Sequence, residues 1–263
     1  MPAEGLVAPA TLELSAAVDS KGNTIAKVEF FDGATLLGED TTIPYSYTLS
    51  SAGAGSCHLM ARVTDADGRS ADSEVIEVVI SSLPAPWKAI EVGDTLAGLA
   101  SETNGVFEVK GSGQLGGTTD AFRFVYQPLS GDGEIVAKLD SFVSPDAAGQ
   151  VGVMIRDNLS PSASFMFMGV GSDGIYRLIR REASGVGTIN KTSVKCSPAN
   201  TWIRVRRSGG NLVGFRSGDG KTWTQIGSVK MAMATNAYLG FAVSSGDLSV
   251  LGTTSYSNVL AIP

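Results

Sequence analysis

The chain has 263 residues, of which 43% are hydrophobic, and it carries a formal net charge of −6. This length favours one large domain or two ordinary ones, and so much apolar sequence argues against a disordered chain. No apolar run approaches the roughly 18 residues that a membrane-spanning helix needs, so we expect no membrane insertion.

The charge is divided unevenly along the chain. Residues 1–83 contain four basic and twelve acidic residues, a net charge of −8, whereas the remainder contains sixteen basic and fourteen acidic residues, a net charge of +2. This difference predicts a domain boundary near residue 84. It also argues against nucleic acid as a partner, because phosphate binding needs clustered Lys and Arg.

The N-terminal stretch MPAEGLVAPATLEL has neither the basic segment nor the apolar segment of a signal peptide. We therefore expect the chain to be an excised piece of a longer secreted or cell-surface protein. The other domains of that parent protein would then be among its partners.

Residues 1–83 show almost no helical periodicity and contain short runs in which apolar and polar residues alternate. The runs are separated by turns rich in Gly, Ser, Asn and Asp. In the run AKVEFF, Val28 and Phe30 share one face, and Lys27 and Glu29 share the other. Several short strands at this spacing predict a β-sandwich.

Two turns in this segment are rich in oxygen ligands, and they contain Asp19, Asp65 and Asp67. Calcium ions are bound by oxygen atoms of such loops, from carboxylates and from backbone carbonyls. Asp is also a good turn former without any metal. A structural calcium ion and a plain turn therefore both stay open, and we expect that no other cofactor is required.

Residues 82–86 separate the two parts of the chain. Two prolines in the small-residue stretch SSLPAPW make this segment stiff and extended. We predict one domain at residues 1–83 and a second at residues 84–263, joined by a short linker at 82–86. Cys57 and Cys196 fall in different predicted domains, so two separate thiols are favoured over a disulfide.

About a dozen alternating runs follow between residues 106 and 262. That is too many for a single immunoglobulin-like sandwich, and it predicts a jelly roll of two large sheets. The stretch SGDGKTW at residues 217–223 has the glycines of a hairpin turn.

Residues 7–80 resemble a bacterial immunoglobulin-like domain, of the kind found along secreted polysaccharide-degrading enzymes and surface proteins. The segments that carry the resemblance are Ile25–Gly33, Leu36–Gly38, Pro44–Tyr47 and Ala61–Gly68. The resemblance implies a spacer or docking module.

Residues 87–262 resemble a concanavalin A-like lectin/glucanase jelly roll, in the subgroup similar to a "regulation of enolase" protein. The segments that carry the resemblance are Asp120–Leu129, Gly131–Gly133, Val151–Arg156 and Ser217–Gly227. Such modules accompany secreted glycoside hydrolases, so the resemblance implies contact with carbohydrate. Where this family often has His in the strand with the F-x-F pattern, this chain has Arg123.

The sequence argues against catalysis. Glycoside hydrolysis needs two carboxylates that flank one bond, and sheets of this kind supply them through the alternating pattern E-x-D-x-x-E. No such spacing occurs, and Glu134 is followed by the apolar residues Ile135 and Val136. We predict that the chain is not an enzyme, and a glycoside hydrolase is the least favoured interpretation.

The run AFRFVYQPL contains the sharpest candidate for a sugar site. Carbohydrate sites combine aromatic rings with groups that hydrogen-bond hydroxyls. Phe122, Phe124 and Tyr126 share one face, but three aligned aromatic residues are more typical of a core. Arg123 and Gln127 share the other face, and we expect them to project from an outer or concave surface and to contact a ligand.

Further strand residues complete the candidate ligand-binding set: Arg156, Tyr176, Arg180, Arg204 and Arg206. By alternation Tyr176 shares a face with Arg180, and Arg204 with Arg206. On one sheet these residues would form an electropositive floor suited to an acidic or hydroxyl-rich glycan. A solvated face with salt bridges is the alternative, and both stay open.

Taken as a whole, the sequence predicts an all-β protein in which an N-terminal Ig-like β-sandwich precedes a larger concanavalin A-like jelly-roll β-sandwich. The predicted function is that of a non-catalytic carbohydrate-binding or adhesion module, with a polysaccharide or glycan as partner. The alternative is a purely structural protein-interaction tandem with no glycan ligand. An Arg123→Ala variant that keeps its fold and loses binding would favour the first.

Overall fold

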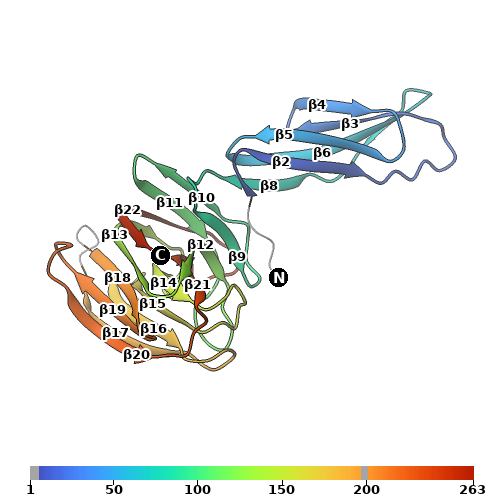
Figure 1. The fold of residues 1–263 in the computed structure, drawn as a ribbon. Coiled ribbons are helices and arrows are strands. Elements are labelled where there is room, and N and C mark those ends of the chain that lie inside the picture. Colours follow the sequence, from blue (N-terminus) through green and yellow to red (C-terminus); the bar gives the residue numbers. More distant parts are fainter. Residues whose placement is uncertain (1–5, 197–200) are drawn as a thin grey trace. The chain divides into compact units, whose positions relative to one another are not determined.

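The fold was examined in a computed structural model that describes residues 6–196 and 201–263, and only the backbone of residues 192–194. The described residues form two compact units, Leu6–Ser82 and Leu83–Pro263 (Figure 1). Every regular element in these ranges is a β-strand, so the all-β prediction is confirmed. The described residues contain no helix with the length and apolar character needed to cross a membrane. That residues 1–83 and 84–263 are separate domains, each able to fold alone, stays a prediction.

The smaller unit is a sandwich of two layers. Its strands are β1 (Leu6–Val7), β2 (Ala10–Ala16), β3 (Ile25–Asp32), β4 (Thr35–Asp40), β5 (Tyr45–Ala52), β6 (Gly55–Asp65), β7 (Ser70–Asp72) and β8 (Ile76–Ser81). One layer has the order β1-β8-β6-β3-β4, with β7 also paired to β6, and the other is the pair β2-β5. Val28 and Phe30 of β3 are buried, as their alternation predicts. On the opposite face Lys27 Nζ lies 2.8 Å from Glu29 Oε1.

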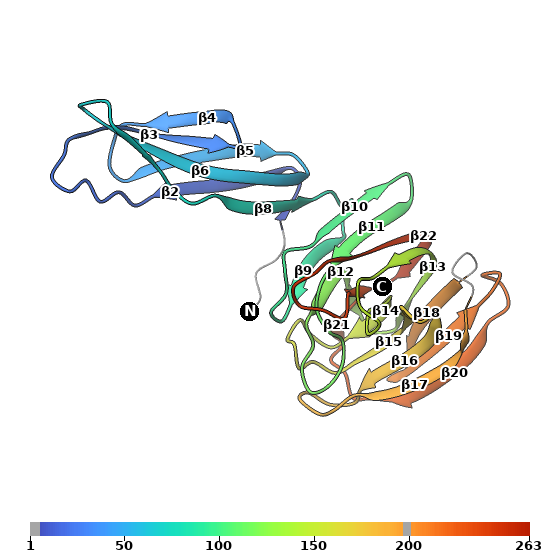
Figure 2. The same ribbon diagram turned by 180° about the vertical axis from the view of Figure 1, so that it is seen from behind.

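The described residues of the larger unit form fourteen strands in two sheets. They are β9 (Lys88–Val92), β10 (Leu99–Thr103), β11 (Val106–Gly111), β12 (Phe122–Ser130), β13 (Gly133–Val143), β14 (Gln150–Arg156), β15 (Phe165–Gly171), β16 (Ile175–Arg181), β17 (Ile189–Lys195), β18 (Thr201–Ser208), β19 (Asn211–Ser217), β20 (Thr224–Lys230), β21 (Asn236–Ser244) and β22 (Gly252–Ile262). We call the sheet β17-β16-β15-β14-β21-β12-β9 the front sheet and the sheet β10-β11-β22-β13-β18-β19-β20 the back sheet. The two sheets form layers when seen from either side (Figures 1 and 2), as the prediction of a jelly roll with two large sheets requires.

Aromatic rings fill the space between the two sheets. Phe241 of the front sheet has its ring centroid 5.2 Å from that of Phe107 and 4.5 Å from that of Tyr256, both in the back sheet. Trp87 stacks on Phe241 at 5.2 Å. The face of the front sheet that carries Phe241 therefore packs against the back sheet. Val125 lies directly opposite Phe241 in the pairing of β12 with β21, so it shares this face.

A second core lies on the other face of the front sheet. Phe122, Phe124 and Tyr126 of β12 are fully buried there, which confirms that this aromatic row is core. The row packs in one cluster with residues of neighbouring strands and with Leu115 and Leu159 from the loops 112–121 and 157–164. These two loops thus cover the outer face of the front sheet.

Candidate functional site

A fully buried arginine joins the loops over the outer face of the front sheet. Arg181, the last residue of β16, directs its two terminal nitrogens at the carboxylate of Asp120, at 2.7 and 2.8 Å. Its guanidinium also donates to four backbone carbonyls at 3.0 to 3.2 Å, those of Pro161, Ala163, Gly117 and Val186. Because these carbonyls belong to three loops, a single side chain fixes the positions of all three.

A second buried arginine lies beside the first. Arg156 at the end of β14 has one terminal nitrogen 3.8 Å from Asp120 and its Nε donates to the carbonyl of Asn158 at 2.8 Å. Its guanidinium carbon lies 5.1 Å from the ring centroid of Phe122, a cation–π contact. Burial lowers the pKa of Arg156 to about 10, against the opposing effect of Asp120, so the side chain stays protonated at neutral pH.

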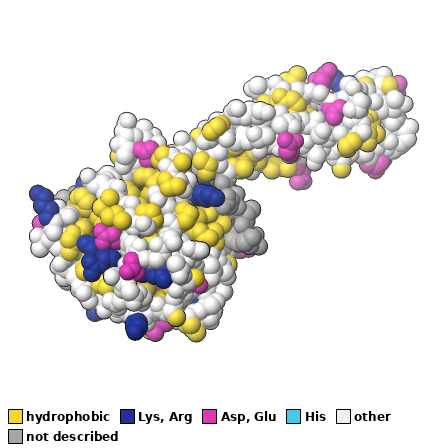
Figure 3. Space-filling view, in the orientation of Figure 1, with side chains coloured by type: hydrophobic (Ala, Val, Ile, Leu, Met, Phe, Trp, Pro, Cys, Tyr) yellow, Lys and Arg dark blue, Asp and Glu magenta, His cyan; other side chains and the backbone are white. Residues whose placement is uncertain are grey.

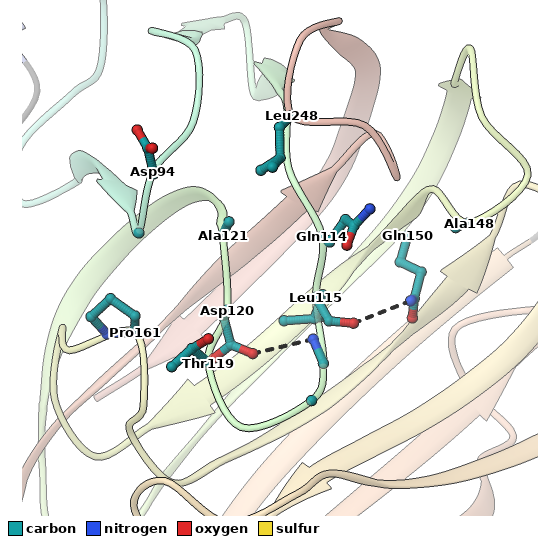
Figure 4. A pocket seen from close by; sticks show the side chains of 13 residues that line it. Asp94, Gln114, Leu115, Thr119, Asp120, Ala121, Ala148, Gln150, Pro161 and Leu248 are labelled. Atoms are coloured by element: carbon teal, nitrogen blue, oxygen red, sulfur yellow. Dashed lines mark hydrogen bonds between the residues drawn. The ribbon is translucent and has the colours of Figure 1, made fainter.

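Two of the loops fixed by Arg181, 112–121 and 157–164, form part of the wall of a pocket of about 630 Å³. Its walls come from the segment 112–121, from four other loops and from the start of β14. The lining residues are Gly93, Asp94, Gln114, Leu115, Gly116, Gly117, Thr119, Asp120, Ala121, Ala148, Gln150, Pro161 and Leu248. In the view of Figure 4, Asp94 and Gln150 lie at opposite sides of the pocket, with Ala121 and Leu115 between them. The pocket therefore combines apolar side chains with a few polar groups, as small-ligand sites do.

The structure places Arg123 and Gln127 away from solvent, which corrects the expectation that they project from a surface. They lie on the face of β12 that carries Val125, between the two sheets, and are 3% and 7% exposed. Arg123 forms an ion pair with Glu91 of β9 at 2.5 Å. The alternation of the strand was predicted correctly. The face with Arg123 and Gln127, which was expected to be at a surface, packs against the other sheet.

Tyr176 and Arg180 also lie on the side of the front sheet that faces the back sheet. Leu178 between them packs against Gly214 and Gly227 of the back sheet, and the Tyr176 hydroxyl donates to the carbonyl of Ser217 at 3.5 Å. Tyr176 is buried, and burial raises its pKa. Arg180 is half-buried and pairs with Glu182 at 2.7 Å.

Arg204 and Arg206 are the two predicted residues that the structure brings together near solvent. They lie on the outer face of the back sheet with Phe215 and Trp223, and we call these four residues the arginine row. The Arg204 guanidinium carbon is 4.9 Å from the ring centroid of Phe215 and 5.6 Å from that of Trp223, and its Nη2 is 2.7 Å from Glu134 Oε2. Arg206 is exposed and lies over Phe215 at 5.7 Å.

In Figure 3, which shows one face of the molecule, Lys and Arg side chains are interspersed with hydrophobic ones on the larger unit. The expected electropositive floor on one sheet is not formed, because the seven predicted ligand residues are divided between two sheets and three faces. A ligand-binding role for any of them stays a prediction.

The predicted cation ligands act in turns. Asp65 accepts hydrogen bonds from the backbone N–H groups of Asp67 and Arg69, at 3.0 and 2.9 Å, and Asp19 accepts one from Lys21 at 3.1 Å. Among the described residues, no group of three or more His, Cys, Asp or Glu could hold a metal ion together. Asp19, Asp65 and Asp67 are thus not one cluster, and calcium at these turns stays a prediction. Cys57 and Cys196 are free thiols.

Sequence reasoning did not find the pocket or the buried pair of Asp120 and Arg181. The pocket residues come from loops, which carry no periodic signal. One signal was present: Arg181 shares a strand face with Ile175 and Ile179, and Ile179 belongs to the core. A charge on such a face requires a buried partner.

Comparisons with known proteins agree with this architecture. A family model described as a bacterial Ig domain matches residues 1–69, which confirms the predicted resemblance of the N-terminal segment. Fibronectin(III)-like modules of CbhA from Clostridium thermocellum are 34% identical, in an alignment that covers 32% of this chain and 90% of theirs with a TM-score of 0.29. No curated protein matches the chain.

Two further solved structures match the chain. A functionally unknown protein from Saccharomyces cerevisiae is 14% identical, covers 66% of this chain and 96% of its own length, and has a TM-score of 0.54. A structure from a study of carbohydrate-binding modules of the β-sandwich superfamily is 11% identical, covers 99% of this chain and 94% of its own length, and has a TM-score of 0.29. The chain is thus an all-β protein whose N-terminal segment matches a bacterial Ig domain and whose larger unit is a sandwich of two sheets.

Proposed function

We propose that the chain is a non-catalytic carbohydrate-binding or adhesion module of a larger secreted or cell-surface protein, and that a glycan binds in the pocket beside Asp120. The two seven-stranded sheets support the resemblance of residues 87–262 to concanavalin A-like jelly rolls of the regulation-of-enolase subgroup. The match of residues 1–69 to a bacterial Ig domain supports an extracellular location, where such domains separate other modules.

The observation that carries the proposal is the pocket itself. Its volume of about 630 Å³ lies within the range of roughly 300–1,000 Å³ that is typical of small-ligand sites. Leu115, Ala121 and Leu248 offer apolar contacts to the C–H groups of a sugar ring, while Asp94, Gln114 and Thr119 offer hydrogen bonds to its hydroxyls. Arg181 fixes two of the loops that line the pocket, 112–121 and 157–164, so this part of the site is formed before a ligand arrives, which lowers the entropy cost of binding.

The acids of the pocket argue against hydrolysis. The lining includes two carboxylates, Asp94 and Asp120. Asp120 accepts from both terminal nitrogens of Arg181 and from the N–H of Gly116 (Figure 4), so it is not available as a general acid or base. Glycoside hydrolysis would need a second working carboxylate across the bond.

The proposal is tested by glycan-array screening of the whole chain, followed by affinity electrophoresis in gels that contain soluble polysaccharides. Ala148→Trp adds a large side chain at the exposed rim of the pocket, and we expect it to abolish retardation. Ser208→Trp, an equally exposed position at the end of β18, is the matched control and should leave retardation unchanged.

Three results would contradict the proposal. If no array glycan and no polysaccharide gel shows binding, the chain is a structural interaction tandem. If Ala148→Trp and Ser208→Trp behave alike, the glycan binds elsewhere. Release of reducing sugar by the chain alone would show that it is an enzyme.

A further inference from the structure

The pocket beside Asp120 has no positively charged residue in its lining, and this restricts its ligand. None of the thirteen lining residues is Lys, Arg or His. Arg156 and Arg181, which lie 3.8 and 2.7 Å from the lining residue Asp120, are 0% exposed. Their guanidinium groups donate to Asp120 and to loop carbonyls, as described above. Among the residues that the structure describes, no cation therefore lines the space that a ligand would occupy.

Five hydrogen-bond donors of the lining are used inside the protein. The pairs are Gly116 N to Asp120 Oδ1 at 3.2 Å, Gly117 N to Thr188 Oγ1 at 3.1 Å, Ala121 N to Gln114 O at 2.9 Å, Ala148 N to Asp146 Oδ1 at 2.6 Å and Gln114 Nε2 to Gly246 O at 3.1 Å. A carboxylate or sulfate group, which is bound best by charged donors, would find no charged donor in the lining.

Acceptors, by contrast, remain available. Asp94 is exposed, and its carboxylate has no ion pair or hydrogen bond to any described residue. The Gln150 amide donates through Nε2 to the carbonyl of Leu115 at 3.5 Å, which directs Oε1 the other way (Figure 4). That Oε1 is buried and has no hydrogen-bond partner, although Gln150 lines the pocket. An unpaired buried acceptor is costly, and a ligand hydroxyl would remove that cost.

We infer that the pocket takes an uncharged saccharide whose hydroxyl groups donate to Asp94 and Gln150, and that it rejects glycans with carboxylate or sulfate groups. This inference rests on the proposed function, because it names the class of glycan for the same site. A uronic acid would place its carboxylate beside Asp94 with no counter-charge, and such like-charge contacts are a common source of discrimination.

The arginine row makes the opposite prediction, so the two surfaces can be distinguished. Arg206 is exposed, and a ligand that bound there would gain from a negative charge. If the row were the glycan site, acidic polysaccharides would bind best and Arg206→Ala would abolish binding. If the pocket is the site, neutral polysaccharides bind best and Arg206→Ala has no effect.

The experiment compares a neutral set (dextran, galactomannan, xyloglucan and a mixed-linkage β-glucan) with an acidic set (polygalacturonate, alginate and chondroitin sulfate) in affinity gels, and measures dissociation constants by calorimetry. We expect retardation by at least one neutral polymer and by no acidic one. Asp94→Ala and Gln150→Met should each weaken binding of the neutral polysaccharide. For Asp94→Ala we expect the dissociation constant to rise by about tenfold, because this change removes a charged acceptor. Arg206→Ala should bind like the wild type, and Trp fluorescence should be native-like for all variants.

Two results would overturn the inference but leave glycan binding intact. One is that acidic polymers bind as tightly as neutral ones, and the other is that neutral polymers still bind the Asp94→Ala and Gln150→Met variants. An absence of binding in both sets would overturn the proposed function as well.

Discussion

Replacement of Arg181 by Met is expected to destabilise the larger unit by about 3 kcal/mol. The substitution keeps an unbranched side chain that replaces the apolar stem of Arg181, but it removes the guanidinium that pairs with Asp120 at 2.7 and 2.8 Å. Breaking one partner of a fully buried ion pair typically costs about 3–5 kcal/mol, because the other charge stays buried without compensation. Arg156, at 3.8 Å from the same carboxylate, supplies part of the lost compensation, so we expect the lower end of that range.

The larger unit can be followed selectively in the whole chain. All three tryptophans, Trp87, Trp202 and Trp223, lie after residue 83, so unfolding in urea monitored by Trp fluorescence reports on that unit. At a slope of about 2 kcal/mol per M, a loss of about 3 kcal/mol lowers the midpoint by roughly 1.5 M urea.

Arg177→Met on the same strand is the matched control. Arg177 shares its strand face with Arg181 and pairs at the surface with Asp173, at 2.7 Å. A surface ion pair of this kind contributes about 0–1 kcal/mol. If Arg181→Met costs no more than Arg177→Met, Arg181 does not hold the loops together in the way described here.

Three further outcomes follow from particular contacts. Gly240→Ala should destabilise the larger unit by about 1–3 kcal/mol in the same urea assay, because the added methyl would meet the backbone of Val125 and Tyr126; a neutral result would show that β12 and β21 are not packed so closely. Backbone N–H groups of Thr222 and Lys221 hold the pKa of Asp219 well below its usual range. The ionised form of Asp219 therefore stabilises the fold above about pH 4, and this contribution is lost as the pH falls further toward the folded-state pKa. The unfolding free energy should therefore fall more steeply from pH 5 to pH 2 in the wild type than in Asp219→Asn, and equal slopes would contradict this assignment. Residues 84–263 produced alone should give the same Trp-monitored unfolding midpoint as the whole chain, and a shift of more than about 0.5 M urea, roughly 1 kcal/mol, would show that the predicted boundary cuts through a folding unit.

The strands were predictable from sequence because their signal is local. Alternation in AKVEFF places Val28 and Phe30 on one face and Lys27 and Glu29 on the other, and the structure confirms the burial of the first pair. The same period of two identified the row of Phe122, Phe124 and Tyr126 as core. In each case neighbouring residues in the chain are sufficient to define the two faces of the strand.

The pocket was not predictable, because it depends on contacts between residues far apart in the chain. Asp120 and Arg181 are 61 residues apart, and the loops they join have no repeating pattern. Alternation gave Arg181 the same face as Arg177, but it could not indicate that one of these arginines is buried and the other reaches Asp173 at the surface. The difference arises from loops 112–121 and 157–164, which cover one end of the strand.

The wrong assignment for Arg123 has the same physical origin, and it changes which experiment is informative. A strand in a two-layer sandwich with both faces covered has two buried faces, so burial alone does not say which one meets the other sheet. Arg123 pairs with Glu91 between the sheets and is 3% exposed, so Arg123→Ala would leave Glu91 without this cation in a largely buried position. Loss of glycan binding in that variant would report a disturbed fold as readily as a lost ligand contact. Asp94 is exposed and forms no ion pair with a described residue. Its substitution therefore tests glycan binding without removing a buried interaction, whereas substitution of Arg123 changes both binding and stability.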